Sequence, residues 1–326
     1  MNKLYPMKFA PLFRDKIWGG QKIKSVLDMD FGALANCGEA WVLSGVGGNE
    51  TVVANGFLEG NEINELVEVY MDDLVGGKVY EKYQNEFPIL VKFIDANDYL
   101  SIQVHPDDAL AHKRGIGNGK TEMWYIISAD QDSELITGFN QKVTQKTYLD
   151  HLESKKLKDI LNVEKVAAGD VFFIPAGRVH ALGPGILLAE IQQTSDTTYR
   201  IYDYDRVDDK GNQRQLHTDE ALEAIDFKVY DTYRSAYPPI KNKSVEVVNQ
   251  PFFTTNIIHL NKPIEKDYEE LDSFVIYTCV NGSLDVKYRD GIVNLRMGEC
   301  LLIPNEVKLI ELHPSNESKL LETYIL

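Results

Sequence analysis

The sequence predicts an all-β protein in which short strands form sandwiches or barrels. Gly, Pro, Asn and Asp separate short apolar segments along most of the chain, which is typical of strands joined by tight turns. The clearest of these segments are residues 89–94, 100–105, 123–127, 171–174 and 274–280.

An internal repeat supports this prediction. Residues 169–175 and 298–304 share the form Gly, acidic residue, four mostly apolar residues, Pro. Each copy predicts a tight turn, a buried strand and a proline that ends the strand. Beyond the proline, Leu309 of the second copy stands where His180 stands in the first, so we expect the second copy to lack a polar inward residue.

Three segments have the periodicity of amphipathic helices instead. Apolar residues recur at 63, 66, 67, 70, 71 and 74, and Gly76-Gly77 should end this helix. A looser apolar stripe covers 148–161. A short helix should begin at Thr218, whose hydroxyl is expected to cap the helix ahead of two acidic residues.

The length and a Pro-rich segment predict two domains. The chain has 326 residues, and a domain typically has roughly 150. The stretch 237–243 is Pro-rich and then polar, and the strand pattern resumes after it. We therefore predict a catalytic domain at 1–236, which contains the helical segments, and a small, metal-free β domain at 237–326.

Composition excludes several classes of protein. With 34 basic and 50 acidic residues the net charge is −16, which argues against binding to nucleic acid or to an anionic membrane. No apolar run reaches ~18 residues and residues 1–6 lack a signal-peptide core, so we expect a cytoplasmic protein. Three cysteines without a Cys-x-x-Cys pair indicate buried thiols. Walker and Gly-x-Ser-x-Gly patterns are absent from the sequence.

The segment 99–108 contains the most informative polar residues. Side chains alternate along a strand, so Ser101, Gln103 and His105 should share one face. For Ser101 and Gln103 alone, a solvent-exposed face is the simpler interpretation. An imidazole and an amide carbonyl two residues apart also suit a metal ion of borderline ligand preference.

Two further residues complete a candidate metal site. Glu122 can face His105 if their strands are neighbours, although a lone Glu on a strand is usually solvated. His180 follows the pattern Gly-x5-Pro-x-Gly-x2-His, in which proline and glycine fix the turn. The proposed ligands of Zn²⁺ or a similar divalent ion are Gln103, His105, Glu122 and His180.

A carboxylate and a guanidinium follow downstream. Glu190 lies in the apolar segment 187–192, and Arg200 ends the segment 195–200. Arg200 either pairs with a surface carboxylate or stabilises negative charge that develops on a metal-held substrate. Arg206 continues the alternation with Arg200, so the run 202–209 is either an aromatic and cationic wall or a charged loop.

These motifs resemble a known family. Residues 169–180 are similar to the second cupin motif, with Pro184 where Asn is common. In the first motif, Gln103 replaces a histidine and Glu122 comes later than usual. In both of these features the sequence resembles type I mannose-6-phosphate isomerases. The signature of that family is similar to residues 18–20, 38–44, 87–95, 100–107, 119–125 and 175–180.

The resemblance implies two cupin-type jelly-roll barrels with a helical insertion in the N-terminal catalytic region. It also implies zinc-dependent interconversion of mannose 6-phosphate and fructose 6-phosphate through an enediol. By resemblance, one Zn²⁺ is held by the four ligands named above, and the catalytic residues are Arg200, Glu190 and Lys120. The resemblance assigns substrate binding to Ser101, Lys92 and Arg206.

Several alternatives stay open at this point. The general base is Glu190, His180 or a metal-bound hydroxide. A dioxygenase or another sugar-phosphate isomerase of the same superfamily would use a similar ligand set with iron or manganese. A non-catalytic sugar-binding cupin would be expected to lose its ligands, and all four are present. The sequence does not predict the oligomeric state.

Overall fold

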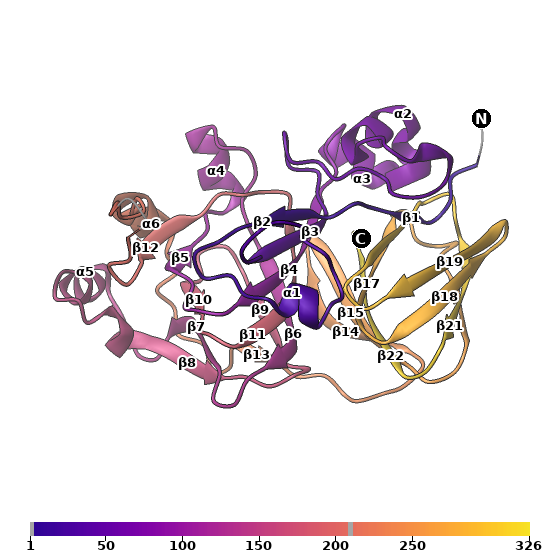
Figure 1. The fold of residues 1–326 in the computed structure, drawn as a ribbon. Helices are drawn as coiled ribbons and strands as arrows, with labels where there is room; N and C mark the ends of the chain where they lie inside the picture. The colour runs from indigo at the N-terminus through magenta and orange to yellow at the C-terminus, as the bar shows by residue number, and fades with distance from the viewer. Residues whose placement is uncertain (1–2, 208–210) are drawn as a thin grey trace.

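The chain folds mostly into antiparallel β-sheets. The structure is a computed structural model, and it describes residues 3–207 and 211–326. Figure 1 shows a half in indigo to pink beside a half in orange to yellow. The β-rich class predicted from the sequence is confirmed. Of the run 202–209, residues 208 and 209 lie outside the described part of the chain.

Two sheets form the N-terminal half. Their strands are β2 (Leu12–Arg14), β3 (Glu39–Leu43), β4 (Ile89–Ala96), β5 (Ile102–Val104), β6 (Glu122–Ala129), β7 (Glu134–Phe139), β8 (Leu161–Lys165), β9 (Val171–Ile174), β10 (His180–Leu182), β11 (Ile186–Gln193), β12 (Tyr199–Tyr202) and β13 (Arg234–Ser235). The larger sheet has the order β13-β9-β6-β11-β4-β3-β2 and the smaller one β12-β5-β10-β7-β8.

Two more sheets form the C-terminal half. Their strands are β1 (Met7–Lys8), β14 (Ser244–Gln250), β15 (Phe253–Leu260), β16 (Ile264–Asp267), β17 (Val275–Asn281), β18 (Ser283–Tyr288), β19 (Gly291–Arg296), β20 (Cys300–Ile303), β21 (Leu309–Pro314) and β22 (Ser318–Tyr324). The orders are β1-β20-β17-β22-β15-β14 and β16-β21-β18-β19. The N-terminal strand β1 thus belongs to the C-terminal half, where Lys8 Nζ binds Glu299 at 2.6 Å.

Short helices connect and cover the sheets. They are α1 (Lys22–Ser25), α2 (Ile63–Val75), α3 (Gly77–Tyr83), α4 (Asp108–Arg114), α5 (Gln145–Glu153) and α6 (Thr218–Ala224), with 3₁₀ turns at Gly56–Leu58 and Leu157–Ile160. In Figure 1, α4, α5 and α6 lie on the side of the N-terminal half that is far from the C-terminal half, and α2 and α3 lie above the C-terminal half. None of the helices in the described ranges is both long and apolar enough to cross a membrane.

The helix predictions were correct in location but not in every detail. Gly76 ends α2 with a φ of 91°, as expected, but α3 begins immediately afterwards. The stripe at 148–161 is two elements, because Lys155 takes a left-handed φ of 58° and interrupts the helix. Thr218 begins α6, but the N-cap is His217, whose side chain makes no capping hydrogen bond, so the predicted hydroxyl cap was wrong.

The two halves share a hydrophobic core. The rings of Phe87 and Phe274 pack with centroids 4.8 Å apart, and one buried cluster includes residues of both halves. The three cysteines are buried free thiols, as expected. Leu309 is 55% exposed, whereas Ile310 is buried. The inward apolar residue of the second repeat is therefore Ile310, one position later than the repeat predicted.

A buried polar cluster surrounds Glu322 in the C-terminal half. Its carboxylate accepts hydrogen bonds from Tyr268 at 2.5 Å, Ser244 at 2.6 Å and Asn256 at 2.9 Å. Lys266 forms an ion pair with it at 2.7 Å. Burial opposes ionisation of this carboxyl, but Lys266 and the hydrogen bonds outweigh burial and lower the pKa of Glu322. The carboxylate is therefore ionised and has several partners.

Replacing Glu322 with Leu should lower the free energy of unfolding at pH 7 by about 3–5 kcal/mol, because it leaves a largely buried ammonium without its partner. The folded-state pKa of Glu322 lies below the unfolded value of about 4.3. Its stabilisation is therefore present above that pH and is lost as pH falls through the folded-state pKa. Urea denaturation at several pH values should show a difference between wild type and variant that shrinks in acid. Equal stabilities at pH 7 would contradict the prediction.

Candidate functional site

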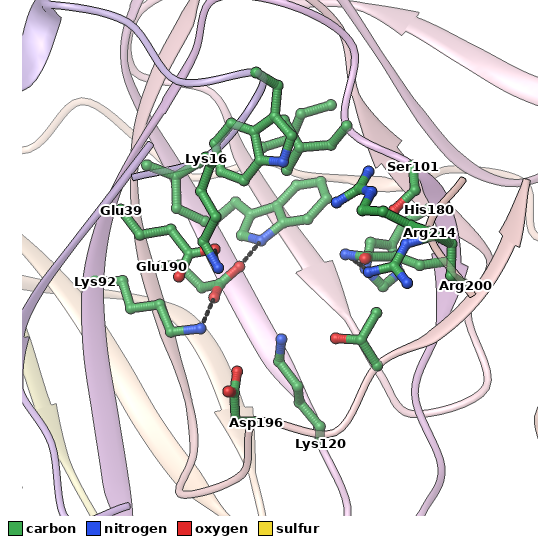
Figure 2. Close-up of a pocket in the computed structure, with 17 residues that line it drawn as sticks. Lys16, Glu39, Lys92, Ser101, Lys120, His180, Glu190, Asp196, Arg200 and Arg214 are labelled. Carbon is green, nitrogen blue, oxygen red and sulfur yellow. Dashed lines mark hydrogen bonds and ion pairs between the residues drawn. The ribbon is translucent and has the colours of Figure 1, made fainter. Parts of the chain in front are cut away.

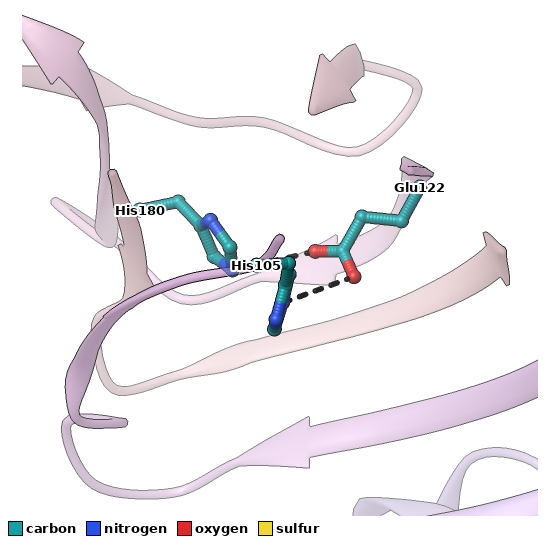
Figure 3. Close-up of side chains that lie close together, drawn as sticks. All are labelled: His105, Glu122 and His180. Atoms are coloured by element: carbon teal, nitrogen blue, oxygen red, sulfur yellow. Dashed lines mark ion pairs between the residues drawn. The ribbon is translucent and has the colours of Figure 1, made fainter. Parts of the chain in front are cut away.

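Three buried side chains from neighbouring strands converge in the N-terminal half. His105 follows β5, Glu122 begins β6 and His180 begins β10, and one potential ligand atom from each lies within 4.8 Å of the others. Glu122 Oε2 lies 3.5 Å from His105 Nε2, and Glu122 Oε1 lies 3.4 Å from His180 Nε2. Figure 3 shows both imidazoles on one side of the carboxylate. The structure therefore brings together three of the four predicted metal ligands.

Backbone carbonyls orient both imidazoles. His105 Nδ1 lies 2.9 Å from the carbonyl oxygen of Thr197, and His180 Nδ1 lies 2.8 Å from that of Arg178. A carbonyl only accepts, so each Nδ1 carries the hydrogen and donates it. The lone pair of each ring is therefore on Nε2, the atom that faces Glu122.

The chemistry of this cluster fits a divalent cation. His105 Nε2 and both carboxylate oxygens of Glu122 are buried and have no hydrogen-bond partner in the part of the chain that the structure describes. Burial lowers the pKa of His180 to about 4 and that of His105 well below its usual value, so both rings are neutral and able to bind metal. Unpartnered buried polar atoms are costly, and two imidazoles with a carboxylate form a common zinc ligand set.

Gln103, the fourth predicted ligand, lies beside the cluster. It is opposite His180 in the pairing of β5 with β10, and its Nε2 lies 3.1 Å from His180 Nε2. A rotation of the amide by 180° exchanges its nitrogen and oxygen, so the same side-chain position can present the oxygen to a metal.

A cavity of about 270 Å³ opens beside His180 (Figure 2). Seven of the predicted site residues line it, namely Lys92, Ser101, Gln103, Lys120, His180, Glu190 and Arg200. Four charged residues that the sequence did not single out also line it, namely Lys16, Glu39, Asp196 and Arg214. Arg206 is not among the lining residues. The wall of the cavity thus mixes cations and carboxylates, which suits a polar ligand.

Glu190 is fixed between two donors on adjacent strands. Trp124 Nε1 on β6 donates to Glu190 Oε2 at 2.8 Å, and Lys92 Nζ on β4 lies 3.5 Å from Glu190 Oε1. Oε1 is buried and accepts no hydrogen bond from the described residues. Glu322 is the corresponding residue of the C-terminal half. It lies on β22 opposite Tyr277 and Asn256, as Glu190 lies on β11 opposite Trp124 and Lys92. Both halves therefore place a buried carboxylate between an aromatic side chain and a nitrogen-bearing side chain.

Lys120 is buried beside the cluster of His105, Glu122 and His180. Its ammonium lies 3.1 Å from Glu122 Oε2. Burial lowers the pKa of Lys120, but the carboxylates of Glu122 and Glu190 outweigh burial and raise it above its usual value. Burial and then Glu190 raise the pKa of Glu122 to about 7, against the opposing charge of Lys120. Lys120 is therefore a fixed cation at the cavity wall.

Glu39, at the start of β3, forms a second cluster of charged side chains at the cavity. It accepts a hydrogen bond from Trp41 Nε1 at 2.8 Å and lies 3.3 Å from Lys16. Burial would raise the pKa of Glu39, but Lys92 and Lys16 lower it to about 2. The alternation of Glu39 and Trp41 along one strand was a usable sequence signal.

Arg200 extends into the cavity from β12. Its Nη1 donates to the carbonyl oxygen of Gln215 at 2.9 Å, and its buried Nε has no partner in the described ranges. Burial and then the charge of Arg214 lower the pKa of Arg200, but a guanidinium stays protonated at neutral pH. Arg200 thus presents a positive charge with donors available to a ligand.

Comparisons with known proteins identify similar enzymes. A model for the catalytic domain of type I phosphomannose isomerase matches residues 7–142. The chain is 32% identical to the mannose-6-phosphate isomerase of Streptococcus mutans over 304 residues, which is 93% of each chain. It is 40% identical to a mannose-6-phosphate isomerase of Bacillus subtilis over 225 residues, which is 68% of each chain.

A solved structure shows the same fold. The crystal structure of the mannose 6-phosphate isomerase from Bacillus subtilis superimposes with a TM-score of 0.88 at 30% identity, covering 98% of this chain and 99% of the other. Sequence identity, coverage and fold agree across nearly the whole length. The chain therefore belongs to the enzyme family of type I mannose-6-phosphate isomerases.

Proposed function

We propose that this protein interconverts mannose 6-phosphate and fructose 6-phosphate, with one Zn²⁺ held by His105, Glu122, His180 and Gln103. The observation that carries the proposal is a buried cluster next to a charged cavity, in which neutral imidazoles face a carboxylate that accepts no hydrogen bond from the described residues. When bound there, zinc supplies a Lewis acid that polarises the oxygens on C1 and C2 of the sugar.

Glu190 is the general base in this proposal. The reaction moves a proton between C2 and C1 through an enediol. Glu190 Oε1 is buried, has no hydrogen bond within the described chain and belongs to a residue that lines the cavity. His180 is less suited to this role, because Nδ1 binds the Arg178 carbonyl and Nε2 faces Glu122. Glu190 removes the proton from one carbon and returns it to the other.

Cations of the cavity complete the chemistry. Arg200 and Lys120 stabilise the negative charge that develops on the enediol oxygens, since both are fixed in a site of low dielectric. Lys92 lies 3.5 Å from Glu190 and forms an ion pair with it. Ser101 and Lys92 are proposed to bind substrate.

We further propose that each half is a cupin-type jelly roll, with the catalytic domain at 1–236 and a metal-free domain at 237–326, whose sheet the strand β1 of the first segment joins. The shared strand order supports this proposal. Strands β4-β11-β6-β9 in the first half correspond to β15-β22-β17-β20 in the second. The second half has Ile310 at its inward position near the start of β21, where the first half has His180.

A coupled assay for fructose 6-phosphate formed from mannose 6-phosphate tests the function. Purified protein should lose activity on chelation and regain it when Zn²⁺ is restored, whereas a protein that acts on another substrate should stay inactive when loaded with zinc. Oxygen uptake in parallel tests for a dioxygenase. Activity that persists in protein shown by metal analysis to contain no divalent ion would contradict the proposed metal.

A further inference from the structure

One guanidinium of the cavity has no role in the proposed chemistry. Arg214 lines the cavity together with Ser101 and Arg200, and Figure 2 shows these three side chains on the same side of it. Lys92 and Glu190 lie on the opposite side in the same view. The cavity therefore has a side rich in arginine, away from the proposed general base.

Asp203 holds Arg214 in place. Arg214 donates from Nε to Asp203 Oδ2 at 2.6 Å and from Nη2 to Oδ1. An isolated antiparallel bridge between Val207 and Gln213 brings Arg214 back beside β12. Asp203 engages the edge of the guanidinium formed by Nε and Nη2. The edge formed by the two Nη atoms is suited to two-point binding of phosphate oxygens.

Arg206 shares the same carboxylate but is directed elsewhere. Its Nη2 donates to Asp203 Oδ1 at 2.6 Å, and its Nη1 lies 3.6 Å from Asp98 Oδ2. Its guanidinium also lies 5.4 Å from the ring centroid of Tyr204. Arg206 thus interacts with two carboxylates and a ring, outside the set of residues that line the cavity.

The arginine-rich side carries a local excess of positive charge. Among the residues that the structure describes, Arg200, Arg206 and Arg214 surround the buried carboxylate of Asp203. The whole chain has a net charge of −16, so a ligand with a phosphoryl group needs such a local positive region. A phosphate monoester carries a charge of about −1.5 to −2 at neutral pH.

We infer that Arg214 binds the phosphoryl group of the sugar phosphate and that Asp203 positions it, an inference that rests on the proposed function. The phosphoryl group is on C6, at the opposite end of the sugar from C1 and C2. A substrate with C1 and C2 against Glu190 therefore extends C6 toward the side of Arg214. In this assignment Arg206, to which the family resemblance assigned substrate binding, acts through its contact with Asp203.

Replacing Arg214 with Ala tests the inference, and Arg206→Ala tests the competing assignment. Arg206 still pairs with Asp203 in the first variant, so the buried carboxylate keeps a partner and the protein should fold. Loss of a charged two-point contact should raise KM for mannose 6-phosphate about 10- to 100-fold and leave kcat within about threefold. The KM of Arg214→Lys should lie between those of wild type and Arg214→Ala, because lysine keeps the positive charge but cannot make the two-point contact of a guanidinium. Arg296→Ala, on the exposed surface of the other half, should change neither constant.

Equilibrium binding separates this inference from the proposed function. Titration calorimetry with glucitol 6-phosphate, which cannot isomerise, and with glucitol measures the contribution of the phosphoryl group without turnover. Arg214→Ala should weaken binding of glucitol 6-phosphate by the same factor as KM and leave glucitol unaffected. If the wild type had no isomerase activity but bound glucitol 6-phosphate more tightly than glucitol, and lost this preference in Arg214→Ala, the proposed function would be contradicted and the phosphoryl site at Arg214 supported. A larger effect of Arg206→Ala, or a fall in kcat at constant KM in Arg214→Ala, would overturn the inference.

Discussion

Glu122→Gln is expected to reduce kcat/KM by about 10³-fold or more, together with loss of bound zinc. The substitution keeps the shape of the side chain but removes the only carboxylate of the cluster, whose two oxygens face His105 and His180. A metal ion contributes several kcal/mol to stabilising charge in the transition state, and about 4 kcal/mol corresponds to 10³ in rate. Metal analysis of the purified variant and the coupled assay measure the two effects.

The control for this variant is Glu86→Gln. Glu86 is a partly buried carboxylate that accepts a hydrogen bond from Asn118 and does not line the cavity. This control should retain full zinc and wild-type turnover. If Glu122→Gln retained one zinc per chain and normal activity, the proposed metal site would have to be abandoned.

Glu190→Gln should lower kcat by about 10²- to 10⁴-fold while zinc content stays normal. Gln can still accept the hydrogen bond from Trp124 Nε1, so the side chain should keep its place. It cannot accept a proton from carbon, and general base catalysis contributes this range of rate enhancement. A second measurement is exchange of the C2 hydrogen of mannose 6-phosphate with deuterium from solvent, which should cease in the variant.

Glu322→Gln is the matched control for this second variant. Glu322 occupies the same register position in the C-terminal half and is equally buried, but it lies outside the cavity. The control should lose stability and keep wild-type turnover at a temperature where it is folded. A normal kcat in Glu190→Gln would show that Glu190 is not the general base and would leave His180 and a metal-bound hydroxide as candidates.

The strands and the meeting of His105 with Glu122 were predictable because their determinants are local. Strand β9 has the predicted bounds, since a glycine turn and a proline delimit an apolar run. His105 and Glu122 were identified from alternation along a strand, which specifies the face a side chain occupies. Helix α4 was missed, although Asp107 caps its N-terminus and Gly115 ends it with a φ of 67°. Those signals surround only seven residues, too few for a clear apolar periodicity.

The positions of Arg214 and Ile310 could not be predicted, because they depend on contacts and turns that are not encoded locally in the sequence. Arg214 reaches the cavity because Asp203 holds it and a single bridge returns the chain, and neither contact has a signature in the sequence around it. Counting from the repeat pointed to Leu309, but the turn before β21 shifts the inward position by one residue. A shift of one residue on a strand exchanges its two faces.

The pairing of β1 with β20 bears on how the chain folds during synthesis. Met7 lies opposite Leu302, and Lys8 and Glu299 form an ion pair across 291 positions of sequence. Residues 7 and 8 are therefore synthesised long before residues 300–303, the strand that they border. The six-stranded sheet is therefore completed only after residues 318–324 have been synthesised, and β1 lacks its strand partner β20 until residues 300–303 have been made.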